Sequence, residues 1–262
     1  MHPDAPSDPP RRFLSTGTWR LAYTDEGSGS ETIVAVPGLP GSVRDFRWLA
    51  AALGEGVRFV RIELPGYGES PRTGHLGMTI PERTEIIRTF IEALHLAPAT
   101  LIGHSSGATL VTHLAHHHPA LVKRCVLVSP PGPHPHYPMG AYRVLVRLFR
   151  SRIGRAAMRP ALRAVFRAFV FPDYLTDRER MYTTLDAAAK DFSLYRDDLG
   201  AMTQPTTLAW ARDDRLIPVA SYEALEAIAP PGTRLHFEDG GHNIQKTRAV
   251  ELARSILGDR DR

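Results

Sequence analysis

Residues 100–107 read TLIGHSSG: the short apolar run Thr100–Ile102 leads into Gly103–Gly107, and a helical pattern of apolar residues begins at Ala108. A G-x-S-x-G sequence between a strand and a helix is typical of a sharp turn, because side chains at the two glycine positions would collide with neighbouring backbone. Such a turn strains the serine backbone and exposes its hydroxyl. The stretch therefore predicts that Ser105 is a nucleophile, whereas an ordinary Gly/Ser turn is the less favoured interpretation.

Short apolar runs and helical patterns alternate on both sides of this turn. This alternation predicts an α/β fold in which helices cover both faces of a mostly parallel sheet. Trp19–Tyr23 alternates polar and apolar residues, which predicts an antiparallel strand at one edge of the sheet. The remaining strands are expected at 33–36, 57–62, 100–102, 125–128, 206–210 and 234–238, and helices at 44–53, 80–96, 108–117, 221–228 and 247–257.

The alternation is interrupted between residues 133 and 204, where helical patterns continue without a clear strand. We expect one core, formed by residues 1–132 and 205–262, with a helical insertion at 133–204. The insertion holds 12 Lys plus Arg against 7 Asp plus Glu, so the net charge of +4 for the whole chain is concentrated there.

The composition narrows the classes of function. The 262 residues are 43% hydrophobic and 23% charged, which is typical of a globular protein, and a net charge of +4 is too small to indicate nucleic-acid binding. Cys125 is the only cysteine, which excludes an intrachain disulfide and cysteine-based metal or redox motifs. No apolar run reaches about 18 residues, and no leader pattern occurs at the start. We therefore expect a cytoplasmic protein.

Further motifs occur in an order that is characteristic of a known family. Pro37–Ser42 (PGLPGS) is similar to an H-G-x-P-G-S loop, and Glu63–Ser70 (ELPGYGES) is similar to a D-x-x-G-x-G-x-S turn. With these motifs and the G-x-S-x-G turn, the chain resembles the α/β-hydrolase fold superfamily over residues 18–257. Pro37 replaces the usual histidine, which organises the loop in that family, and Glu63 replaces the usual aspartate.

The resemblance implies a Ser-Asp-His triad with Ser105 as its nucleophile. The stretch Trp210–Pro218 (WARDDRLIP) resembles the family's W-G-x-x-D-x-x-x-P motif, which places the acid at Asp214 and leaves Asp213 as the alternative. The base is expected at His242, because GGH at this position resembles the family's histidine loop.

The resemblance also implies an oxyanion hole made by backbone N–H groups of Leu39 and Ser106. No cofactor is implied.

A second family position for the acid, residues 129–132 (SPPG), contains no carboxylate. A serine nucleophile argues against haloalkane dehalogenases and epoxide hydrolases, which need an aspartate there.

Twelve histidines compete for functional roles. His104 is adjacent to Ser105 and is expected to pack beneath the turn. His113 and His117, at i and i+4, share a helix face and could bind a metal, but no Asp or Glu lies beside them in the sequence. The expectation is therefore that the chain has no metal site.

The insertion is interpreted as a helical cap over the substrate pocket. It combines apolar residues with eight arginines among which no acidic residue occurs. A solvated outer face over an apolar inner face is the simplest interpretation; attraction of anionic substrates and weak contact with anionic membranes are the alternatives. The arginines are Arg143, Arg147, Arg150, Arg152, Arg155, Arg159, Arg163 and Arg167.

The resemblance implies hydrolysis of a carboxylic ester or lactone through an acyl-Ser105 intermediate. The substrate is expected to be a small molecule with an apolar acyl or alkyl part. A carbon–carbon bond hydrolase or a lyase on the same triad is one alternative. A ligand receptor that retains the triad is another.

Overall fold

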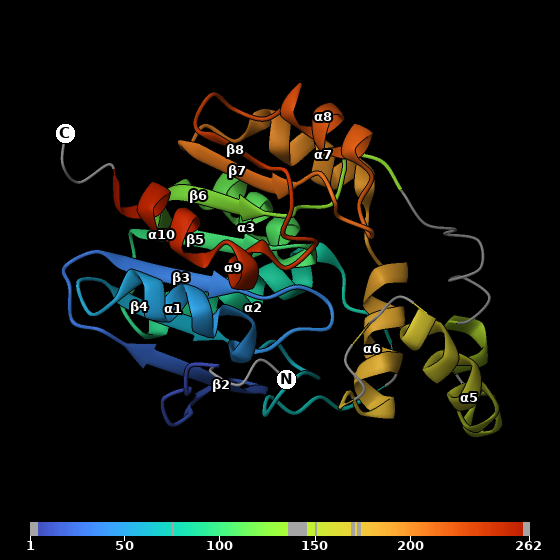
Figure 1. Cartoon of the computed structure of the whole chain (residues 1–262). Coiled ribbons are helices and arrows are strands. Elements are labelled where there is room, and N and C mark those ends of the chain that lie inside the picture. Colours follow the sequence, from blue (N-terminus) through green and yellow to red (C-terminus); the bar gives the residue numbers. More distant parts are fainter. Residues whose placement is uncertain are drawn as a thin grey trace.

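An eight-stranded sheet forms the centre of the molecule (Figure 1). The computed structural model describes residues 5–74, 76–135, 146–149, 151–168, 171 and 174–258. The strand order is β1-β2-β4-β3-β5-β6-β7-β8, in which β1 and β2 run antiparallel to their neighbours and the rest pair in parallel. The strands are β1 (Arg12–Thr16), β2 (Trp19–Glu26), β3 (Thr32–Val36), β4 (Arg58–Ile62), β5 (Ala99–His104), β6 (Val122–Val128), β7 (Thr206–Ala211) and β8 (Arg234–Phe237).

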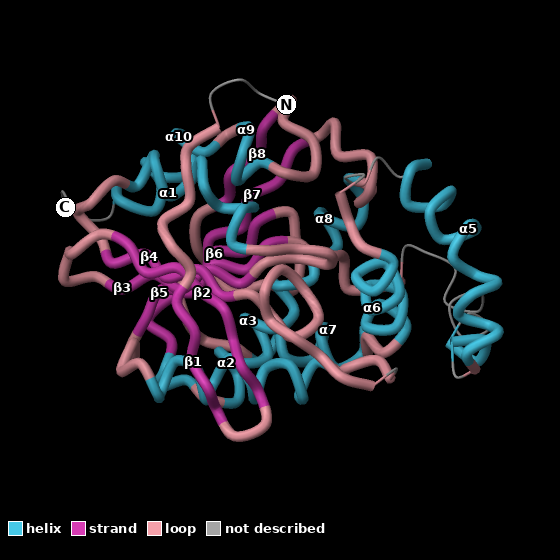
Figure 2. The backbone as a smooth tube through the Cα atoms, turned by 90° about the horizontal axis from the view of Figure 1, so that it is seen from below, coloured by secondary structure: helices cyan, strands magenta, loops and turns pink. Residues whose placement is uncertain are grey.

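Helices cover both faces of this sheet, as its apolar strands require (Figures 1 and 2). In β3, Ile33 and Ala35 pack against one helical layer, while Val34 and Val36 pack against the other. The first layer contains α1 (Arg47–Leu53), α9 (Ile244–Thr247) and α10 (Ala249–Leu257), and the second contains α2 (Ile80–Ala93), α3 (Ser106–His117) and α7 (Phe192–Ala201). Helix α8 (Val219–Glu226) follows β7, and short 3₁₀ turns span Val43–Phe46 and Pro119–Leu121.

The predicted α/β-hydrolase fold, with its mostly parallel sheet, is confirmed. The segment at Trp19–Tyr23 forms part of an antiparallel strand, but the expected edge position is wrong, because β1 pairs outside it. Strand β1 has mostly exposed or half-buried residues and therefore lacks the apolar pattern that identifies the central strands.

The segment interpreted as a cap is helical where the structure describes it. Helices α5 (Arg152–Ala168) and α6 (Asp177–Ala188) pack on each other beyond the carboxyl ends of the parallel strands (Figures 1 and 2). By contrast, α7 packs on α3 within a helical layer of the core. The division at residues 133 and 204 stays a prediction.

In the described ranges, no helix combines the length and the apolar character needed to cross a membrane.

Candidate active site

Ser105 lies at the turn between β5 and α3, with backbone angles φ 48° and ψ −123°. A non-glycine residue in this region is strained, so the surrounding structure must hold it there. A Cβ at Gly103 would lie 2.6 Å from the Cα of Ala108, and one at Gly107 would lie 2.3 Å from the carbonyl oxygen of Val36. The two glycines therefore permit the close packing of the turn, and Ser105 is left partly exposed at its apex.

His242 links Ser105 to a carboxylate. Its Nε2 lies 2.9 Å from the Ser105 Oγ, and its Nδ1 lies 2.7 Å from the Oδ2 of Asp214. Asp214 follows β7 and His242 follows β8, so parallel strands bring the three residues to one edge of the sheet although they are distant in sequence. This arrangement can take a proton from the serine hydroxyl and stabilise the imidazolium that results.

Asp214 is surrounded by hydrogen-bond donors. Its Oδ1 accepts from the backbone N–H groups of Leu216 and Ile217, and its Oδ2 accepts from the Tyr222 hydroxyl as well as from His242. Burial alone would raise the pKa of this carboxyl, but the bonds from His242, Tyr222 and Leu216 outweigh it and hold the pKa below its ordinary value. Asp214 is therefore an anion at neutral pH, as an orienting carboxylate must be.

Asp213, the alternative acid, does not contact His242. Its side chain is exposed, and its Oδ1 accepts a hydrogen bond from the backbone N–H of Gly241 at 2.7 Å. Of the two adjacent aspartates, Asp214 is the one whose carboxylate reaches the imidazole.

His104 is buried against the loop that carries His242. Its Nε2 lies 3.0 Å from the carbonyl oxygen of His242, and the two rings are 5.1 Å apart. Burial, followed by the neighbouring His242, lowers the pKa of His104 well below its ordinary value. A neutral His104 that donates from Nε2 supports the backbone of His242 without adding a second base to the site.

The two residues expected to form the oxyanion hole belong to segments that adjoin Ser105. Ser106 is the first residue of α3, where backbone N–H groups have no acceptor within the helix. Leu39 belongs to the loop after β3, and a Cβ at the preceding Gly38 would lie only 3.1 Å from the Cβ of Ser105. Glycine at position 38 thus lets this loop approach the nucleophile closely.

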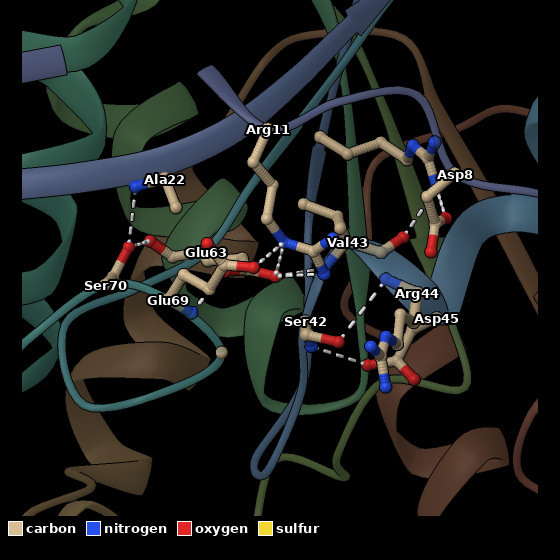
Figure 3. Close-up of polar contacts among 12 residues, drawn as sticks. Asp8, Arg11, Ala22, Ser42, Val43, Arg44, Asp45, Glu63, Glu69 and Ser70 are labelled. Carbon is tan, nitrogen blue, oxygen red and sulfur yellow. Dashed lines mark hydrogen bonds and ion pairs between the residues drawn. The ribbon is translucent and has the colours of Figure 1, made fainter. Parts of the chain in front are cut away.

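Glu63 organises the loops around the site, a role that the motif comparison did not assign to it. Its carboxylate is fully buried and accepts from the Arg11 guanidinium, from the Glu69 backbone N–H at 2.6 Å and from the Val43 backbone N–H at 3.4 Å (Figure 3). The Ser70 hydroxyl continues this network by donating to the carbonyl oxygen of Glu63. The sequence indicates the importance of this residue only indirectly, because Glu63 occupies the aspartate position of the D-x-x-G-x-G-x-S motif.

Part of the arginine set of the cap is neutralised. Arg163 forms a two-bond ion pair with Asp177 of α6 at 2.8–2.9 Å, and Arg159 lies 3.9 Å from the same carboxylate. On the adjoining part of the α5 surface, Leu162 and Phe166 are buried. Of the eight arginines, Arg143 and Arg150 lie outside the described residues.

Comparisons with known proteins agree with the fold. Residues 31–170 match the family described as alpha/beta hydrolase fold. One relative is the dihydrolipoyllysine-residue acetyltransferase component of the acetoin cleaving system of Cupriavidus necator, which is 27% identical over 92% of this chain. This chain spans only 66% of the length of that protein. A 2-hydroxy-6-oxononadienedioate/2-hydroxy-6-oxononatrienedioate hydrolase of Paraburkholderia phymatum is 26% identical over 83% of each chain. The solved structure of an alpha/beta hydrolase fold protein from Burkholderia ambifaria has a TM-score of 0.78 at 18% identity, over 94% of this chain and 97% of that one.

Proposed function

The chain belongs to the alpha/beta hydrolase fold family, and from this premise we propose that it is a serine hydrolase that cleaves a carboxylic ester or lactone through an acyl-Ser105 intermediate. The observation that carries the proposal is the unbroken series of hydrogen bonds from Ser105 through His242 to the buried Asp214. Cys125 is no competing nucleophile, because burial raises the pKa of its thiol to about 12.

In the first half of the reaction, the Ser105 Oγ attacks the carbonyl carbon of the substrate and its proton moves to the Nε2 of His242. Asp214 stabilises the imidazolium through Nδ1. When the carbon–oxygen bond of the tetrahedral intermediate breaks, the Nε2 proton goes to the leaving alcohol. A water molecule then repeats the sequence on the acyl-enzyme, which releases the acid and restores Ser105.

The negative oxygen of each tetrahedral intermediate needs two N–H donors. We assign this role to the backbone of Leu39 and Ser106, supported by the close approach of the Gly38 loop to Ser105 and by the position of Ser106 at the start of α3. Neither donor depends on side-chain identity.

A carbon–carbon bond hydrolase is the second candidate. It is favoured by the names of several relatives. Two of them, each 26% identical to this chain, are 2-hydroxy-6-oxononadienedioate/2-hydroxy-6-oxononatrienedioate hydrolases. In that reaction a ketone takes the place of the ester carbonyl, and the carbon leaving group receives the proton. The same three side chains serve both reactions.

The two candidates differ in the substrate that they turn over. A panel of p-nitrophenyl esters of graded acyl length and a 2-hydroxy-6-oxo-dienoate should be assayed with wild type and Ser105→Ala. Ester hydrolysis that Ser105→Ala abolishes, together with a fluorophosphonate adduct on the Ser105 peptide, is the expected result. Turnover of the dienoate alone would favour the second candidate. Ligand-dependent binding of another protein without any turnover would favour a receptor.

The exposed arginines of α5 are interpreted as a solvated outer face, and the alternative is that they attract anionic substrates over a long range. Because exposed charges are screened over about 8 Å at physiological salt, kcat/KM for an anionic ester should in that case fall as salt rises, and that for a neutral ester should not. Co-sedimentation with anionic but not neutral vesicles would favour membrane contact instead. If neither effect occurs, the arginines form a solvated outer face.

A further inference from the structure

A cluster of imidazoles surrounds one carboxylate at the far end of α3. His113, His116 and His117 come from α3, and Asp198 comes from α7. The Asp198 Oδ2 lies 2.6 Å from the Nδ1 of His113, while Oδ1 lies 2.8 Å from the Nδ1 of His116 and 3.0 Å from the Nε2 of His117. We call these four residues the histidine cluster.

The carboxylate of this cluster is buried, and within the described residues no lysine or arginine forms an ion pair with it. Asp198 is only 2% exposed, and among the residues that the structure describes its ion-pair partners are the three imidazoles alone. Burial raises the pKa of Asp198, but the imidazole hydrogen bonds outweigh it and hold the pKa below its ordinary value. The buried carboxylate is therefore held by imidazole nitrogens, which are themselves common metal ligands.

The spacing of these groups suits a transition-metal ion. The ligand atoms of His113, His117 and Asp198 all lie within 4.8 Å of one another. Zn²⁺ binds imidazole nitrogen and carboxylate oxygen at about 2.0–2.2 Å, so neighbouring ligands of a tetrahedral site are roughly 3.3 Å apart. The observed N···O distances of 2.6 and 3.0 Å would have to lengthen by about 0.7 and 0.3 Å, respectively.

We propose that His113, His117 and Asp198 bind a divalent transition-metal ion, with Zn²⁺ as the best match to their nitrogen and oxygen donors. Water completes the coordination. In each imidazole the proton moves from the nitrogen that faces Asp198 to the other ring nitrogen, which frees a lone pair for the metal. His116 is a positioning residue that holds the carboxylate through its hydrogen bond to Oδ1.

The location assigns this ion a structural role. His113 and His117 lie eight and twelve residues after Ser105, so the ion is roughly 12–18 Å along the helix from the nucleophile. Asp198 belongs to α7, which follows the helices over the carboxyl ends of the strands. The ion would therefore fasten α7 to the helix that carries the nucleophile, and the side chain of His117, 44% exposed, leaves an entry path from solvent.

Only the two histidine ligands of this site could be predicted from the sequence. His113 and His117 show the i, i+4 spacing of a metal-binding helix face, but Asp198 lies 81 residues beyond His117 and no local motif connects them. The expectation of no metal site rested on the absence of a neighbouring carboxylate, which the packing of α7 on α3 supplies.

The test is titration of chelator-treated, tag-free full-length protein with Zn²⁺ and, separately, Co²⁺. We expect one equivalent of Zn²⁺ to bind, the melting temperature to rise by roughly 5–10 °C at a hundredfold excess over the dissociation constant, and bound Co²⁺ to show the intense visible absorption of tetrahedral coordination. Absence of stoichiometric Zn²⁺ binding, or a purely octahedral Co²⁺ spectrum, would overturn the proposal. These readouts do not depend on hydrolytic activity.

Variants of the consecutive histidines give a matched comparison. His116→Gln should weaken Zn²⁺ binding roughly 10–100-fold, His117→Gln should weaken it further, and His118→Gln, outside the cluster, should bind like wild type. His116 and His117 are sufficiently exposed for these variants to fold. Equal affinity in wild type, His117→Gln and His118→Gln would show that the metal binds elsewhere.

Discussion

The carboxylate of Asp213 accepts a hydrogen bond from the backbone N–H of Gly241 at 2.7 Å. Gly241 immediately precedes His242, so Asp213 supports the loop of the proposed base while Asp214 contacts the imidazole itself. Two adjacent and chemically identical residues therefore hold the same loop through different atoms. Substitutions of Asp213 and Asp214 are therefore expected to have different effects on activity.

Asp214→Asn should lower turnover by about 10⁴, as loss of the orienting carboxylate does in serine proteases. Asp213→Asn should remain close to wild type, because the amide oxygen of asparagine can still accept from Gly241. The measurement is kcat for the best ester of the panel, with circular dichroism to show that both variants fold. If the larger loss falls on Asp213→Asn, the acid is Asp213 and the assignment from the hydrogen bonds is wrong.

Tyr222 offers a test of the charge on Asp214. Its hydroxyl donates to the same Oδ2 that faces His242, and thereby withdraws negative charge from it. In Tyr222→Phe the Asp214 carboxyl loses one of the hydrogen bonds that lower its pKa, so it should become protonated at a higher pH and no longer support the proposed base there. We expect the rise of kcat/KM with pH to move to higher pH, with a loss of kcat much smaller than in Asp214→Asn. A shift to lower pH would contradict this role, and Tyr195→Phe, another buried tyrosine, serves as the control.

Glu63 should contribute mainly to stability. Glu63→Gln weakens the bonds to Arg11 and to the backbone of Glu69, leaving the Arg11 guanidinium, 16% exposed, without its buried partner. We expect the free energy of unfolding to fall by about 2–4 kcal/mol in urea titrations. Glu69→Gln is the control, because the Glu69 side chain is 56% exposed and its ion pair with Arg11 should contribute less than about 1 kcal/mol. Equal losses in the two variants would mean that burial of Glu63 does not matter.

Periodicity was sufficient to predict the sheet wherever strands are buried on both faces. In β5 every residue is buried and apolar residues dominate, whereas β1 has no buried residue and was not recognised. The candidate triad could be nominated because each member follows a strand and carries a local motif. The contacts of Asp198 and Glu63 join segments that are far apart in the chain. Local sequence patterns do not indicate which distant segments pack together, so these contacts could not be predicted.

Lys190 predicts an unusual dependence of stability on pH. It is 8% exposed, and burial, with Arg83 nearby, lowers its pKa to about 7. In the unfolded chain a lysine titrates near 10.4. Between about pH 7 and pH 10 the unfolded state therefore binds one more proton than the native state, so this group makes stability rise with pH by up to about 1.4 kcal/mol per pH unit.

Lys190→Met removes this contribution and keeps an unbranched side chain that is one atom shorter. The variant should be more stable than wild type at pH 7, and the difference in the free energy of unfolding should shrink steadily towards pH 10. Urea titrations at pH 7, 8, 9 and 10 measure it, with Lys123→Met as the control, because the Lys123 side chain is 59% exposed. Because other titrating groups are common to all three proteins, the differences isolate the lysine. Parallel pH profiles for Lys190→Met and wild type would mean that Lys190 keeps its charge in the folded protein up to its ordinary pKa.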